Sequence, residues 1–204
     1  MKKYALDIII LTILFPLVVL SQETVKEPST GKVFPAMVKF THEGKEYVLA
    51  ATGLTVRKKV IFKVYGMVHY MEEPTRAGSE EDAFNAVLTD GKAKQITLDF
   101  ARDVDAAKIK EAYADGFKQH ASPEDLQKIQ SLIDQFTGYF AKDVKENEQF
   151  VFRWLPGGSI IAIVQGEQKP IITNGLFAQA LWSIWFGKDS IVDRSELIER
   201  MLKK

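Results

Sequence analysis

Segment 49–71 of the chain alternates apolar and polar side chains, and this pattern constrains the fold more than any other feature of the sequence. The even-numbered positions toward its end are apolar: Val60, Phe62, Val64, Val68 and Tyr70. A repeat of two residues is typical of a β-strand that lies with one face on a core. Most of the odd-numbered positions carry longer polar side chains, with Ile61 and Met67 between them: Arg57, Lys59, Lys63, Tyr65 and His69. If the strand is unbroken, these side chains point to one side of the sheet, and we expect the functional residues among them.

The composition is that of an ordinary globular domain. Of the 204 residues, 46% are hydrophobic and 26% are charged, which is enough for a full core. The 27 basic and 27 acidic residues leave no net charge, so we expect no nucleic-acid partner, which usually requires a basic excess. The absence of cysteine excludes disulfides, thiolate metal sites and a cysteine nucleophile. We predict neither a metal nor a cofactor, because the histidines show no metal-ligand spacing and are better explained by structural roles: His42, His69 and His120.

The N-terminus carries the pattern of a secretory signal peptide. A short basic start, Met1 to Lys3, precedes an almost wholly apolar segment, Ile8 to Leu20, which is followed by Ser21. We therefore expect residues 1–21 to be a cleaved signal and the mature protein to be secreted across the inner membrane into the periplasm. The alternative is an uncleaved anchor, but Asp7 leaves the apolar length short of a span of about 20 residues. If the segment is a cleaved signal, we expect the protein to contact the membrane only through this segment and only before cleavage.

The rest of the chain is predicted to be a flexible lead-in, residues 22–32, and one domain, residues 33–204. The lead-in is polar and contains a proline and a glycine. Alternation and turn residues predict strands at 33–41, 46–51 and on through 49–71, 94–101, 149–155, 159–165 and 169–173. Capping residues and apolar stripes predict helices that begin near Ser79, Asp105, Ser122, Asn174 and Ser195. Strands in hairpins with helices inserted as a block favour an α+β fold with a mostly antiparallel sheet.

Several short motifs lie at a distinctive spacing along the chain: Phe34-Pro35-Ala36, Gly44 to Tyr47, Gly53 to Arg57, Arg57-Lys58-Lys59, Lys63-Val64-Tyr65, Tyr70 to Glu72, Asn174-Gly175 and Phe186-Gly187. With these motifs the chain resembles the chalcone isomerase family, and most closely its bacterial chalcone isomerase-like branch. The resemblance covers roughly the whole chain after the N-terminal segment. It implies a chalcone isomerase-like fold, in which helices cover a large antiparallel sheet and a ligand cleft lies between sheet and helices.

Two activities occur in the family that the chain resembles. The enzymes close a flavonoid ring by intramolecular addition of a phenolate oxygen. Noncatalytic relatives hold a fatty acid, whose carboxylate is bound by an Arg and a Tyr. Arg57 falls where both groups place their Arg, and Tyr65 falls where the binders have Tyr and the enzymes have Thr. This comparison implies a ligand-binding role for both residues.

Other polar groups of the enzymes are not matched. Their Tyr and Asn align with Ala107 and Ala114, which offer neither a hydroxyl nor an amide. Their Ser or Thr near the C-terminal helix aligns with Ile171, although Thr173 lies close and a small shift in the alignment would supply the hydroxyl. The resemblance therefore implies that most of the groups that would orient a phenolate are absent.

We predict that the protein binds an amphipathic carboxylate such as a fatty acid through Arg57 and Tyr65, with the neighbouring lysines in solvent. A guanidinium binds a carboxylate with two hydrogen bonds, and a phenol can add a third. Two alternatives stay open. One is an isomerase (an intramolecular lyase) in which Arg57 stabilises an oxyanion, and the other is an envelope structural or assembly protein whose cleft is filled by its own side chains. A cavity lined by Trp185 or Phe177 and open to Arg57 would favour binding.

Overall fold

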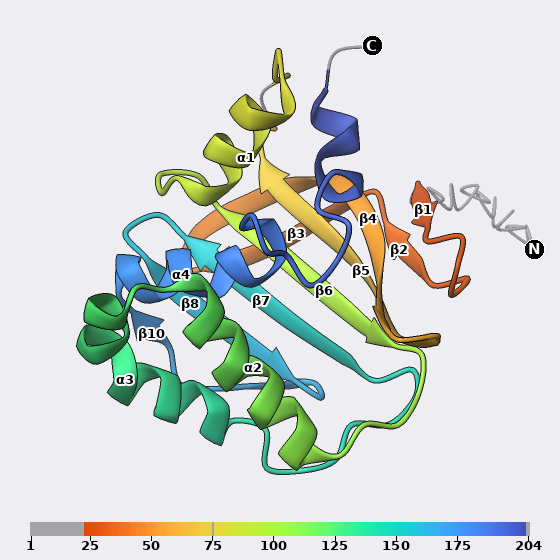
Figure 1. The fold of residues 1–204 in the computed structure, drawn as a ribbon. Helices are drawn as coiled ribbons and strands as arrows, with labels where there is room; N and C mark the ends of the chain where they lie inside the picture. Colours follow the sequence, from red (N-terminus) through yellow and green to blue (C-terminus); the bar gives the residue numbers. More distant parts are fainter. Residues whose placement is uncertain (1–22, 75, 203–204) are drawn as a thin grey trace, which may run out of the picture.

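The computed structural model describes residues 23–74 and 76–202, which form an α+β fold on one curled sheet (Figure 1). The strands of the sheet lie in the order β10-β8-β7-β6-β5-β4-β3, and β9 pairs with β8. Their bounds are β3 Met37–His42, β4 Lys45–Lys59, β5 Phe62–Glu72, β6 Lys94–Phe100, β7 Gln149–Leu155, β8 Ser159–Val164, β9 Glu167–Gln168 and β10 Ile172–Thr173. The strand pairs are antiparallel, which confirms the predicted fold class.

Helices cover one face of this sheet (Figure 1). They are α1 Glu80–Leu88, α2 Ala106–His120, α3 Pro123–Gly138, α4 Gly175–Phe186 and the 3₁₀ helix η1 Glu196–Met201. All five begin directly after the predicted residues, and at three of them the side chain, of Ser79, Ser122 or Asn174, accepts a hydrogen bond from a backbone N–H in the first turn. The apolar sides of the helices form the main core with the sheet. Among the described residues, no helix combines the length and apolar character needed to cross a bilayer.

Segment 49–71 is a hairpin, so the prediction of one unbroken strand is wrong. β4 ends at Lys59, Val60 and Ile61 form the turn, and β5 begins at Phe62. Val60 and Phe62, which the alternation placed on a core, are exposed at the end of this hairpin. The apolar pattern continued through the turn, and therefore the sequence concealed it.

A bulge brings the two predicted site residues together on one face. With a two-residue turn and no bulge, odd positions of β4 would pair with even positions of β5. A register shift between Arg57 and Lys58 changes this, and Arg57 pairs directly with Tyr65. Directly opposed residues of an antiparallel pair project to the same face with Cα atoms about 4.5–5.5 Å apart. Arg57 and Tyr65 are thus neighbours across strands, not eight residues apart along one strand.

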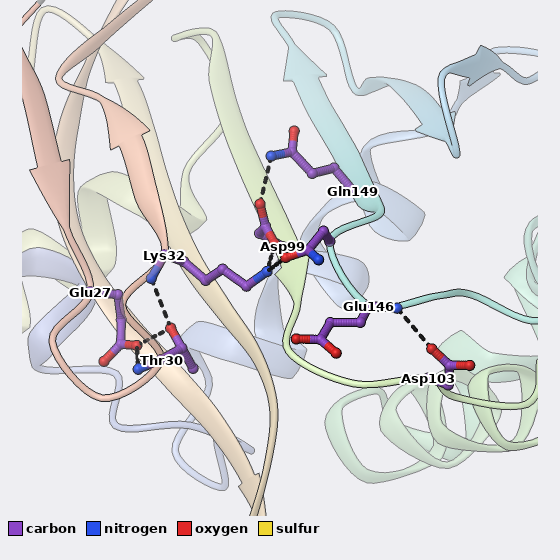
Figure 2. A network of polar contacts seen from close by, with 8 residues as sticks. Glu27, Thr30, Lys32, Asp99, Asp103, Glu146 and Gln149 are labelled. Atoms are coloured by element: carbon purple, nitrogen blue, oxygen red, sulfur yellow. Dashed lines mark hydrogen bonds and ion pairs between the residues drawn. The ribbon is translucent and has the colours of Figure 1, made fainter.

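The opposite face of the sheet is covered by the N-terminal residues. β1, Thr24–Lys26, pairs with β2, Val33–Pro35, and their apolar side chains form a second core with β4 and β5. In Figure 2, Glu27 accepts hydrogen bonds from Thr30 in the turn between β1 and β2. Lys32 forms an ion pair with Asp99 of β6. Residues 23–32 are therefore ordered against the sheet, which differs from the expected flexible lead-in.

His69 lies in a buried polar network between β4, β5 and α4. Trp182 Nε1 donates to His69 Nε2 at 3.4 Å, and His69 Nδ1 lies 2.6 Å from Thr52 Oγ1. Thr52 Oγ1 in turn donates to the carbonyl oxygen of Leu197 at 2.8 Å. Burial, together with the charge of Lys94, holds the pKa of His69 well below its ordinary value, so the ring is neutral. The structural role predicted for His69 is confirmed, but it is buried under α4 and not in solvent.

Candidate functional site

A cavity of about 780 Å³ lies between the β4–β5 hairpin, β6, α2 and α4. Most of its walls are apolar or aromatic side chains of the sheet and of the two helices: Val64, Phe100, Ile109, Ala112, Ile184 and Trp185. Arg57, Tyr65 and Tyr113 add polar groups to this lining. The volume lies within the range of about 300–1,000 Å³ that is usual for small-molecule sites, which are also mainly apolar with a few polar groups. The cleft expected between sheet and helices is therefore present.

Arg57 is half-buried and presents a cation to this cavity. Its Nη1 donates to the carbonyl oxygens of Lys58, at 2.8 Å, and Ile191, at 2.7 Å. These two bonds fix the plane of the guanidinium. No carboxylate among the described residues lies within ion-pair distance of Arg57, and its Nη2 and Nε have no described hydrogen-bond partner. Two donors and one uncompensated positive charge are thus available to an anion in the cavity.

Tyr65 is a neutral phenol beside this cation. Its hydroxyl oxygen accepts a hydrogen bond from Trp185 Nε1 of α4 at 3.0 Å. Burial raises the pKa of Tyr65 to about 12, although the N–H of Trp185 and the charge of Arg57 act in the opposite direction. The Tyr65 proton has no acceptor among the described residues. It can therefore be donated to a ligand, while Trp185 holds the oxygen in place.

Tyr113 of α2 belongs to the same site, and the sequence did not identify it. Its position in the apolar stripe of α2 predicted a core residue, and its ring indeed packs against Phe140 at 4.8 Å and Trp185 at 6.2 Å. Yet Tyr113 lines the cavity, and its hydroxyl has no described hydrogen-bond partner. Burial, with the nearby Tyr65, raises the pKa of Tyr113 well above its ordinary value. The signal available in the sequence was a tyrosine adjacent to Ala114, the position at which the enzymes have Asn.

The remaining candidates from the sequence comparison lie outside the cavity. Ala107 and Ala114 are on α2 but do not line it. Ile171 is exposed, and Thr173 lies in β10, where its hydroxyl is 2.9 Å from that of Ser159. A small shift in the alignment therefore does not supply the missing hydroxyl. Of the aromatic residues proposed as lining, Trp185 lines the cavity, whereas Phe177 belongs to the core.

The acidic residues at the cavity rim are paired with lysines. Asp103 accepts from Lys145 Nζ at 3.0 Å, and Asp105 pairs with Lys108 at 2.6 Å. In residues 23–74 and 76–202, no group of His, Cys, Asp or Glu is arranged to hold a metal ion. Of the cations that line the cavity without a described carboxylate partner, Arg57 is half-buried, whereas Lys59 and Arg102 are exposed.

Comparison with known proteins now identifies the family. A sequence model described as chalcone isomerase-like matches residues 30–203. The chain belongs to the chalcone isomerase-like family. No curated protein sequence matched the chain significantly. Among solved structures, the protein is similar to the crystal structure of a fatty-acid binding protein of Arabidopsis thaliana, with a TM-score of 0.66 and 15% identity over 88% of this chain and 97% of that chain.

The family match confirms the resemblance inferred from the motifs, and the structural likeness confirms the chalcone isomerase-like fold. At 15% identity the likeness shows the fold alone. The cavity of this chalcone isomerase-like protein combines the guanidinium of Arg57, which has no described carboxylate partner, with two neutral phenols and apolar walls.

The raised pKa of Tyr65 predicts a loss of stability in alkali. An unfolded tyrosine ionises near pH 10, whereas folded Tyr65 keeps its proton to about pH 12. The contribution of this group to the free energy of unfolding is fully present below about pH 10. It falls by about 2–3 kcal/mol in total as the pH rises from about 10 to about 12. Denaturant unfolding between neutral pH and pH 12 should therefore show a smaller alkaline loss in Tyr65→Phe than in wild type. An identical loss in both proteins would contradict the burial of the Tyr65 hydroxyl.

Proposed function

We propose that this protein binds a fatty acid, or a closely similar amphipathic carboxylate, in the cavity between sheet and helices. The observation that carries the proposal is Arg57, a half-buried guanidinium with two unused donors and no described carboxylate partner, beside the mainly apolar walls of the cavity. An isolated charge in such surroundings is costly unless an opposite charge joins it. A ligand carboxylate supplies that charge.

The carboxylate would lie across the hairpin, between Arg57 and Tyr65. Nε and Nη2 of Arg57 point from one edge of the guanidinium and can bind both carboxylate oxygens. The Tyr65 proton adds a third hydrogen bond, and Trp185 keeps its oxygen in position. Each of these donors is held by the protein before the ligand arrives, which reduces the entropy lost on binding.

The acyl chain would follow the apolar walls toward α2 and α4. Val64, Phe100, Ile109 and Ile184 lie along this path. Each methylene taken from water contributes about 0.8 kcal/mol. Affinity should therefore rise with chain length until the cavity is full. The similar Arabidopsis structure is that of a fatty-acid binding protein, which agrees with this function.

Mass spectrometry and thermal melting test the function directly. Protein purified from its host is denatured, and the released small molecules are identified. Delipidated protein is then melted with increasing palmitate, which should raise the melting temperature, because a ligand that binds only the folded state stabilises it. Methyl palmitate is the control and should raise it far less. If no acyl ligand is released and palmitate leaves the melting temperature unchanged, the protein does not bind fatty acids, and the structural or assembly role becomes the better explanation.

Tyr113 favours a second candidate, the isomerase. A reaction of this kind needs a polar group besides Arg57 to orient a phenolate, and Tyr113 places a second phenol in the same cavity as Tyr65. Arg57 would then stabilise the developing oxyanion. Chalcone cyclisation, followed by absorbance, tests this candidate: turnover that disappears in both Arg57→Gln and Tyr113→Phe would establish an enzyme. If palmitate raises the melting temperature and no chalcone turnover is measured, the isomerase is rejected and the binding function is retained.

The location of this activity is part of the proposal. The basic start and apolar segment support export to the periplasm, with cleavage near Ser21. These residues lie outside the described part of the chain. Cell fractionation and the intact mass of the purified protein test it: a periplasmic protein that lacks residues 1–21 is expected. A full-length protein in the membrane fraction would instead indicate the anchor.

A further inference from the structure

The end of the β4–β5 hairpin exposes three consecutive apolar side chains. Val60 is 88% exposed, Ile61 80% and Phe62 56%, and they are the most exposed large apolar residues described. Single exposed apolar residues are common on protein surfaces, but a cluster at the end of a projecting hairpin is not. We call these three residues the hairpin tip. Its side chains form no part of either hydrophobic core.

The backbone of the tip also shows that folding does not favour these residues. Val60 has φ of +59°, in the left-handed region where glycine, asparagine and aspartate are preferred. A β-branched residue is strained there. Because Val60 lowers the stability of the fold and packs against neither core, its presence here is more simply explained by binding to another surface than by folding.

Basic side chains surround the tip. Lys58, Lys59 and Lys63 flank it in sequence, and the guanidinium of Arg102 lies 4.9 Å from the centre of the Phe62 ring. Among the described residues, no carboxylate lies within ion-pair distance of Lys58 or Lys59. The rim acids nearby are paired with other lysines. The chain as a whole has no net charge, and therefore the positive field here is a local feature.

The tip lies at the entrance of the cavity described above. Lys59, Val60 and Phe62 line the cavity together with Arg57 and Tyr65. Ile61 and Lys58 do not line it. A molecule that entered past the tip would therefore meet Arg57 directly.

We propose that the hairpin tip docks on a bilayer containing anionic phospholipid, with Ile61 inserted among the lipids and the lysines at the headgroups. Apolar side chains with a basic surround are the combination that binds such interfaces. A protein partner fits less well, because three side chains fall far short of the about 800 Å² that each partner usually buries. Docking would open the cavity toward the membrane surface, where fatty acids are present. The docking itself is independent of the proposed function, whereas this exchange of ligand rests on it.

The proposal extends the role expected for the membrane, which the sequence limited to the N-terminal segment. That segment could bind vesicles by itself, so the test must report on the tip alone. The chain has no cysteine, and a single Ile61→Cys variant can therefore carry one environment-sensitive fluorophore. Ile171→Cys is the matched control, because Ile171 is an exposed isoleucine directly before β10. β10 is an edge strand of the sheet and is separated from the β4–β5 hairpin by three strands (Figure 1).

Vesicles of phosphatidylcholine with and without phosphatidylglycerol are added to each labelled protein. A blue shift of the label at position 61 is expected with anionic vesicles, and little or none at position 171. Vesicle affinity, measured by sedimentation against unlabelled wild type, should fall at least about tenfold in Ile61→Asp, which removes the aliphatic side chain that inserts into the bilayer. Lys58→Glu should lower it at least about fivefold. A label at position 61 that stays in water, or full vesicle affinity in Ile61→Asp, would overturn the proposal.

Palmitate binding in solution separates this proposal from the proposed function. Ile61→Asp should bind palmitate as wild type does, because Ile61 does not line the cavity. Wild-type protein that docks but does not bind palmitate would refute the fatty-acid function and leave docking intact. Protein that binds palmitate but shows no insertion at position 61 would refute docking alone.

Discussion

Replacing Arg57 with glutamine is expected to lower the affinity for palmitate by about 10- to 100-fold, which corresponds to the about 1.5–3 kcal/mol of hydrogen bonds to a charged group. Glutamine keeps a polar amide on a shorter side chain, and it removes the charge and the paired donors of Nε and Nη2. The half-buried carboxylate of the ligand would then lose its counter-charge. Isothermal titration of delipidated wild type and Arg57→Gln measures the difference.

The matched control for this experiment is a change in the ligand. Methyl palmitate has the same acyl chain but no charge, so it should bind both proteins with nearly the same affinity. Arg57→Lys adds a further comparison, because an ammonium keeps the charge without the paired geometry and should lie between the other two proteins. The melting temperature should change little in Arg57→Gln, since only two hydrogen bonds to backbone carbonyls are lost. Equal loss of palmitate and methyl palmitate would show that Arg57 acts on the shape of the cavity and not on the carboxylate.

The helices and strands could be predicted from the sequence where capping residues or alternating side chains determine them. α3 begins at Pro123 because Ser122 accepts a hydrogen bond from Asp125 N, and α4 begins at Gly175 because Asn174 does the same for Phe177. The alternation in residues 94–100 likewise gave β6, although both of its faces are covered. Such signals depend on neighbouring residues only, and they are therefore visible without the fold.

The hairpin in segment 49–71 could not be predicted because its turn lacks turn chemistry. Val60 and Ile61 stand where Gly, Asn or Asp usually mark a two-residue hairpin. The bulge at Arg57 has no marker in the sequence either. The prediction that Arg57 and Tyr65 share a face is nevertheless confirmed. The turn alone would place them on opposite faces, and the one-residue shift of the bulge returns them to the same face. The two residues share a face across two strands, and not along one strand as predicted.

Two parts of the site depend on contacts that no local pattern carries. The carbonyl oxygen of Ile191 orients Arg57 from a loop that is remote in sequence, and any residue there would offer the same oxygen. The ring of Tyr113 packs in the core, as the sequence pattern predicts, and only its place in the cavity lining makes it a candidate site residue. Both contacts arise from tertiary packing of α2, α4 and the loop after α4.

Replacing Gly53 with alanine is expected to destabilise the protein by about 3 kcal/mol, at the upper end of the usual cost of overpacking. The added Cβ would lie 2.0 Å from the carbonyl oxygen of Glu196 and 2.4 Å from the carbonyl carbon of Leu197. These are backbone atoms of η1, which cannot rotate away as a flexible side chain can. η1 would have to move from β4, although Leu197, Ile198 and Met201 anchor it in the main core. Thermal melting should show a loss of about 6–12 °C.

The same substitution should weaken palmitate binding, because η1 determines the position of the loop that precedes it. Ile191 lies in this loop between α4 and η1, and its carbonyl oxygen orients Arg57. A displaced η1 would move that oxygen and loosen the guanidinium. Gly138→Ala is the matched control: no atom lies within 4 Å of the added Cβ at the end of α3, so its melting temperature should be unchanged or slightly raised and its affinity that of wild type. If Gly53→Ala melts as Gly138→Ala does, η1 does not pack on β4 as closely as the structure shows, and the orientation of Arg57 must depend on other contacts.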